Sequence, residues 1–170
     1  APQPPQLGME IDSATLSEIL SLKSEQIRTA KHKPVMVSAG VYFLIVEVDG
    51  LESLSAAQSP DADTSEAFSS EGIFLYCHVA NGEYRARMFA PNHGIQEDPA
   101  TGSAVAAFAG LMGLLHDRDE DWCAQVTQGV EMGRPSHLKA RFSRQSGEVR
   151  QIEVGGHAIL MRDGVLTLAE

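Results

Sequence analysis

The sequence predicts an α+β domain in which a curved, mainly antiparallel β-sheet or barrel wraps around one central apolar helix. Residues 103–115 are apolar on every side, and a helix without a polar face must be buried all round. Short segments rich in β-branched and aromatic residues lie before and after this helix, separated by turn residues. The 170 residues, 43% of them hydrophobic, suffice for one compact core.

The first elements follow from local patterns near the start of the chain. Residues 1–8 are proline-rich and are predicted to form a linker. A short helix is predicted over 13–22, because its leucines and isoleucine recur on one face, with Asp12 or Ser13 as the N-cap. The polar segment 60–70 is expected to carry a short surface helix.

The strand predictions rest on β-branched and aromatic runs. Residues 35–48 form the strongest run, with Gly40 marking a bulge or a close approach. Residues 72–79 and 84–89 are predicted to form a hairpin across Asn81-Gly82, a favourable tight-turn pair. Further short strands are predicted over 123–128, 138–142, 149–154, 157–161 and 165–168.

The composition excludes several classes of function. The formal net charge of −10 disfavours binding to nucleic acid, because a polyanion would be repelled. No apolar stretch is long enough to span a membrane and the N-terminus does not resemble a signal peptide, so a cytoplasmic location is expected. Cys77 and Cys123 lie in apolar runs and are predicted to be buried free thiols.

The candidate chemistry lies in residues 94–104, GIQEDPATGSA, at the entry to the apolar helix. The first turn of a helix has unpaired N–H groups and a positive dipole end, which suit a substrate carboxylate. Gly102 would let a ligand approach the backbone, and Ser103 adds a hydroxyl donor. Asp98 could accept or deliver a proton beside the same anion. A purely structural alternative makes Asp98 the N-cap and the proline that follows it the first helical residue.

The segment 87–104, RMFAPNHGIQEDPATGSA, resembles the signature of the phenazine-biosynthesis PhzF-like family, which has the diaminopimelate epimerase-like fold. Three further segments support the resemblance, namely 38–46 (SAGVYFLIV), 128–136 (QGVEMGRPS) and 154–158 (VGGHA). The similarity runs from about Leu7 to the end of the chain.

The resemblance implies a cofactor-independent isomerase made of two similar halves, with the active site in the cleft between them. This chain would be the C-terminal half, with residues 9–170 as its domain and about 164–170 as a last strand belonging to the missing N-terminal half. The family's Glu acid/base and a nearby His would lie in that missing half, so this chain alone is expected to be inactive. The catalytic residues expected here are Asp98 and Ser103, and the expected substrate-binding residues are Glu97, Thr101 and Gly102.

At several positions the sequence differs from related families, and these differences bear on the type of reaction. Epimerases of this fold use two cysteines, whereas Thr101 occupies the corresponding position here, which disfavours thiol chemistry. Tyr42 stands where the family commonly has proline, and His93 stands where a small or apolar residue is common. His93 is expected to be a solvent-exposed loop residue. The six histidines show no metal-ligand spacing, and no nucleotide-binding motif is present, so no metal or cofactor is expected.

Two functions therefore remain open. The first is a proton transfer on a small carboxylate substrate by the intact parent protein. The second is a non-catalytic module that binds a small anion or pairs with another half. Because a lone half would expose the face that normally meets its twin, a homodimer is expected.

Overall fold

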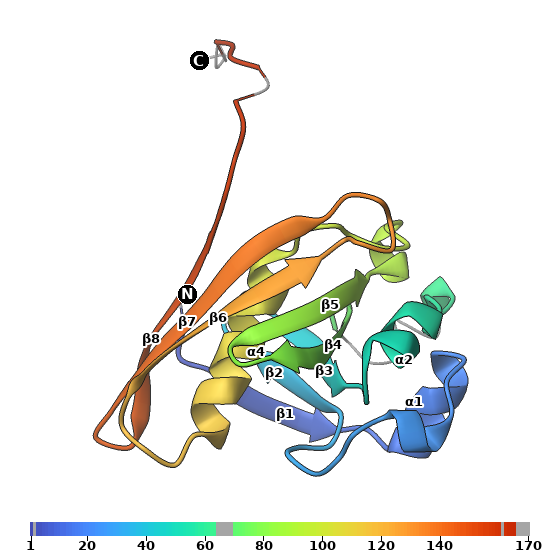
Figure 1. Cartoon of the computed structure of the whole chain (residues 1–170), viewed down its shortest axis with the longest axis horizontal. Coiled ribbons are helices and arrows are strands. Elements are labelled where there is room, and N and C mark those ends of the chain that lie inside the picture. The colour runs from blue at the N-terminus through green and yellow to red at the C-terminus, as the bar shows by residue number, and fades with distance from the viewer. Residues whose placement is uncertain (2, 64–69, 161, 166–170) are drawn as a thin grey trace, which may run out of the picture.

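The computed structural model describes residues 1, 3–63, 70–160 and 162–165. Within them, one curled sheet contains eight strands, whose spatial order follows the chain (Figure 1). Five neighbouring pairs are antiparallel and two are parallel, so the sheet is mixed and mainly antiparallel, as predicted. The strands are β1 (Gln6–Glu10), β2 (Val35–Ser38), β3 (Tyr42–Glu47), β4 (Ile73–Ala80), β5 (Glu83–Phe89), β6 (Asp121–Gln128), β7 (Ser136–Gln145) and β8 (Glu148–Gly156).

Helix α4 (Gly102–Leu115) lies in the hollow of the sheet, which curves around it (Figure 1). It packs against β2, β3, β7 and β8, and its middle turns are buried on all sides. Its glycines allow this close packing. A Cβ on Gly110 would lie 2.7 Å from the Cβ of Pro5, and one on Gly113 would lie 2.7 Å from a Val149 methyl group. The predicted central helix is therefore confirmed, with bounds within one residue.

A second core lies on the other face of the sheet, under α1 (Ser13–Ile19) and α2 (Leu51–Ala56). Leu16 of α1 and Leu54 of α2 are fully buried in the same hydrophobic cluster as Leu44 and Leu75 of the sheet. Asp12 is the N-cap of α1, because its carboxylate accepts the N–H groups of the second and third residues after it. Two short 3-10 helices, η1 (Ser24–Gln26) and η2 (Pro91–His93), also lie within the described residues.

Two predictions near the N-terminus were wrong in detail. The segment 35–48 forms two antiparallel strands instead of one, because the chain reverses at Gly40. The φ of Gly40 is 143°, a backbone conformation that residues other than glycine rarely adopt. Strand β1 begins at Gln6, inside the predicted linker 1–8. Its backbone pairs with the edge of β2, with Gln6 opposite Ser38.

The C-terminal region also differs from the prediction. Residues 157–160, predicted as part of a strand over 157–161, are not in a strand and are exposed, and among the described residues none pairs with them. Val165 is likewise exposed and outside any strand, and the rest of the predicted strand 165–168 lies outside the described residues. The helix expected within 60–70 falls largely on residues 64–69, also outside the described residues.

The two cysteines lie in different surroundings. Cys77 is buried in the second core as predicted, and burial raises the pKa of its thiol to about 11. Cys123 is exposed, contrary to the prediction, because the side chains of β6 alternate and those of Ala124 and Val126 take the inner face. Within the described residues, every helix is too short to cross a lipid bilayer.

Candidate functional site

Backbone hydrogen bonds hold the loop between β5 and α4 against the end of β5. The N–H of Asp98 donates to the carbonyl oxygen of Met88 at 3.0 Å, and Ala90 and Ile95 exchange two backbone hydrogen bonds of 3.1 and 3.2 Å. Helix α4 begins only at Gly102, with Thr101 as its N-cap. The structural alternative for Asp98 is therefore wrong as stated, because Asp98 lies three residues before the cap.

The first turn of α4 is open to solvent. Gly102 and Ser103 are exposed, and their backbone N–H groups have no acceptor among the described residues. A Cβ on Gly102 would have only a Val154 methyl group within reach, at 4.0 Å. The helix thus presents free donors and its positive dipole end to a space that a small anion can enter.

A hollow of about 270 Å³ lies beside Ser103. The turn between β2 and β3 forms one wall through Ala39, Gly40 and Val41, and Ala106 of α4 forms another. None of the residues that line this hollow carries a charge. A ligand whose carboxylate binds the helix end could therefore place an uncharged part here.

Asp98 and Thr101 are held together by Gln128, at the end of β6. The Thr101 hydroxyl donates to Oδ2 of Asp98 at 2.5 Å. The Gln128 amide nitrogen donates to the Asp98 carbonyl oxygen at 2.6 Å and to the Thr101 hydroxyl oxygen at 3.1 Å, and its oxygen accepts the Thr101 N–H at 3.3 Å. The structure therefore directs the Thr101 hydroxyl to Asp98, and its predicted contact with substrate stays a prediction.

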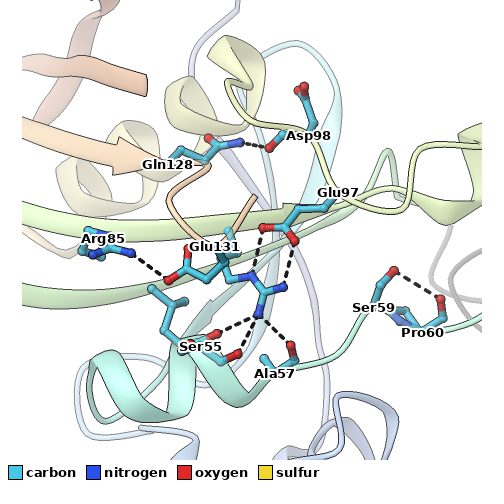
Figure 2. Close-up of polar contacts among 11 residues, drawn as sticks. Ser55, Ala57, Ser59, Pro60, Arg85, Glu97, Asp98, Gln128 and Glu131 are labelled. Carbon is cyan, nitrogen blue, oxygen red and sulfur yellow. Dashed lines mark hydrogen bonds and ion pairs between the residues drawn. The ribbon is translucent and has the colours of Figure 1, made fainter. Parts of the chain in front are cut away.

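Glu97 faces the other way, toward α2. Both of its carboxylate oxygens accept from Arg87, at 2.9 and 2.8 Å, and the remaining Arg87 nitrogen donates to three carbonyl oxygens at the end of α2 (Figure 2). The side chains of both residues are largely buried. Figure 2 shows the Asp98 carboxylate pointing away from this pair. The structure therefore engages Glu97 in anchoring the loop, and its predicted contact with substrate stays a prediction.

A neighbouring ion pair secures the loop after β6. Arg85 of β5 donates to Glu131 at 2.7 Å, and both side chains are mostly buried (Figure 2). On the same side, Gly129 adopts a φ of 77° beside Pro99, where a Cβ would lie 2.9 Å from the proline carbonyl oxygen. Arg87 and Arg85 thus each anchor one of the two loops that meet at Asp98.

His93 is half exposed and contacts Glu71 at 3.0 Å, so the prediction of an exposed loop histidine is confirmed. Among the described residues, no three His, Cys, Asp or Glu side chains are arranged to hold a metal ion.

A buried polar cluster lies away from α4's first turn and was missed by the sequence analysis. The Tyr76 phenol oxygen lies 2.8 Å from Nε2 of His32 and 3.3 Å from a carboxylate oxygen of Glu47. Burial raises the pKa of Tyr76, with the Glu47 charge acting in the same direction. Burial lowers the pKa of His32, so a neutral ring is favoured there. The three residues of this cluster, His32, Glu47 and Tyr76, are far apart in the sequence, and no local sequence pattern predicts their contact.

Comparison with known proteins places these features in context. The family model described as phenazine biosynthesis-like protein matches residues 1–164. An uncharacterized isomerase of Mesorhizobium japonicum is 34% identical over 96% of this chain and 57% of its own length. Trans-2,3-dihydro-3-hydroxyanthranilate isomerase of Pseudomonas chlororaphis is 31% identical over 70% of this chain and 43% of its own length.

Solved structures agree with the observed fold. A PhzF-family phenazine biosynthesis protein of Bacillus anthracis superposes with a TM-score of 0.74 at 20% identity, over 91% of this chain and 55% of that one. A predicted epimerase of Pseudomonas aeruginosa gives a TM-score of 0.69 at 27% identity, over 98% of this chain and 57% of that one. The chain thus spans about half the length of these proteins. That it corresponds to their C-terminal half stays a prediction.

Proposed function

Since the chain belongs to the phenazine biosynthesis-like protein family, whose named relatives include isomerases, we propose that it forms part of an isomerase that moves a proton on a small carboxylate substrate without a cofactor. The observation that carries the proposal is the exposed first turn of α4, where free N–H donors lie a few residues after the carboxylate of Asp98. A cytoplasmic location is part of the same proposal.

In this proposal the N–H groups of Gly102 and Ser103, together with the Ser103 hydroxyl, bind the substrate carboxylate. The uncharged part of the substrate would occupy the hollow beside Ser103. Asp98 would accept or return the proton, and a second acid–base group would come from the rest of the parent protein. Thiol chemistry is disfavoured because Cys77 is buried with its pKa raised to about 11, and Cys123 lies on the outer face of β6.

The test is steady-state kinetics of the whole parent enzyme. Asp98→Asn keeps the size of the side chain but removes its basicity, and should lower kcat by about 100-fold or more. Ser103→Ala removes one donor to the carboxylate and should raise KM by roughly tenfold. Asp117→Asn, an exposed residue in the loop after α4, is the control and should leave both constants unchanged. Near-normal turnover of the Asp98 variant would refute its assignment.

A second candidate function is a binding or assembly module. Two exposed apolar side chains lie beside the first turn of α4, namely Val41, in the hollow next to Ser103, and Val154, next to Gly102. We propose that a second copy of the chain covers them, giving a homodimer. Sedimentation velocity should detect a dimer that Val41→Asp dissociates. A monomer at high protein concentration would contradict this proposal, and saturable carboxylate binding without any turnover by the parent protein would favour the module over the enzyme.

A further inference from the structure

Gln128 is a fully buried polar side chain at the end of β6, directed at the loop that carries Asp98. Burying an amide is unfavourable unless its donors and acceptor are paired. Gln128 satisfies this requirement entirely on two residues, Asp98 and Thr101, that lie about 30 positions earlier in the chain.

The orientation of the Gln128 amide is determined by its partners. Its oxygen accepts a backbone N–H, which can only donate, and its nitrogen donates to a backbone carbonyl oxygen, which can only accept. Reversing the amide would place donor against donor and acceptor against acceptor. The assignment of nitrogen and oxygen is therefore chemically fixed.

This orientation dictates where the Thr101 hydroxyl hydrogen points. The Gln128 nitrogen donates to the hydroxyl oxygen at 3.1 Å, so the hydroxyl cannot return its hydrogen to that nitrogen. The hydrogen is directed to Oδ2 of Asp98, 2.5 Å away. Oδ1 of Asp98 has no partner among the described residues, so one carboxylate oxygen is held and the other is left free.

We propose that Gln128 is a positioning residue, which acts through the Thr101 hydroxyl to fix the rotamer of Asp98 and to present its Oδ1 to the substrate. The proposal rests on the role of Asp98 in the proposed function. A simple loop anchor would hold the backbone of Asp98 without controlling its carboxylate, whereas a positioning residue controls the orientation of the carboxylate as well.

The experiment reads the Asp98 side chain directly, by the ¹³C shift of its carboxyl carbon and by its χ1 couplings in the 170-residue chain. Thr101→Val removes the hydroxyl with little change of shape, and Thr101→Ser keeps it. Gln128→Met removes the amide, and Gln128→Asn withdraws it by one methylene group while remaining polar. Gln125→Met, on the same strand but exposed, is the matched control.

We expect Thr101→Val, Gln128→Met and Gln128→Asn to shift the Asp98 carboxyl signal in the same direction and to average its χ1 couplings. Thr101→Ser and Gln125→Met should leave both at their wild-type values. The Gln128→Met/Thr101→Val double variant should shift the signal no further than Thr101→Val alone, because the two groups act in series. An unchanged Asp98 signal in folded Gln128→Asn would overturn the proposal, as would equal effects of the two Thr101 variants.

A parallel titration with benzoate separates this inference from the proposed function. If wild-type protein shows no saturable shift at the Gly102 and Ser103 amides, the carboxylate site fails, while the Asp98 measurements still decide the role of Gln128. If benzoate binds but every variant leaves the Asp98 signal unchanged, the positioning role fails alone.

Discussion

Replacing Arg87 with Met removes five hydrogen bonds that join the loop carrying Glu97 to the end of α2. The side chains of Arg87 and Glu97 are only 10% and 14% exposed, so solvent screens the pair little. The substitution would leave a buried carboxylate without its counter-charge, and three carbonyl oxygens without their donor. Removing one partner of such a pair typically costs about 3–5 kcal/mol. For a domain of this size, this corresponds to a fall in Tm of roughly 6–20 °C.

Urea unfolding followed by circular dichroism measures this effect. Arg150→Met is the matched control, because Arg150 pairs with Glu148 at 2.9 Å on the surface, and should change the free energy of unfolding by less than about 1 kcal/mol. Adding Glu97→Gln to Arg87→Met should recover part of the loss, since the uncompensated charge disappears. If Arg87→Met unfolds at the same urea concentration as the control variant, the reasoning is refuted.

Three further predictions concern other parts of the fold. Iodoacetamide at pH 8 should alkylate exposed Cys123 and spare Cys77, because a pKa of about 11 leaves roughly one in a thousand Cys77 thiols as thiolate. Equal labelling of the two cysteines in mass spectrometry would contradict this prediction. Burial lowers the pKa of His32 from 6.5, so the stability that its neutral ring contributes is complete above about pH 6.5 and is lost as the pH falls through the folded-state pKa. The midpoint of urea unfolding should fall over this pH range, and His32→Gln should reduce that pH dependence. Gly129→Ala should destabilise the protein by more than the roughly 1–2 kcal/mol that a left-handed backbone costs, because the new Cβ would lie 2.5 Å from a carbonyl oxygen. Gly133→Ala, at a similar φ but in open space, is the control and should show the backbone cost alone. Equal free energies of unfolding for the two variants would contradict the steric clash.

The features predicted from the sequence are those encoded in adjacent residues. The uniformly apolar run 103–115 predicts a buried helix, and Asn81-Gly82 predicts the hairpin between β4 and β5, where Gly82 adopts a φ of 73°. The turn at Gly40 was missed because glycine within an apolar run is equally compatible with a bulge, and only the pairing of β2 with β3 decides between them.

The site loop was located from the sequence, but the partners of its side chains were not. Glu97 was expected to contact substrate because it lies next to Asp98 in the chain. Its actual partner, Arg87, is held by α2, an element about 30 residues earlier, and such a contact arises only once the sheet has formed. Gln128 reaches Asp98 in the same way, across the parallel pairing of β5 and β6.

The strictly sequential order of the eight strands has a consequence for how the chain folds. Among the described residues, each strand pairs with its predecessor and successor. The four antiparallel pairs β2–β3, β4–β5, β6–β7 and β7–β8 are joined by short connections, so they can form by loop closures that lose little chain entropy. Helix α4 is different, because it contacts the early strands β2 and β3 and the late strands β7 and β8 at the same time. Its docking joins early and late parts of the sequence, so we expect this step to limit the folding rate, and substitutions of its buried alanines to slow folding as well as to speed unfolding.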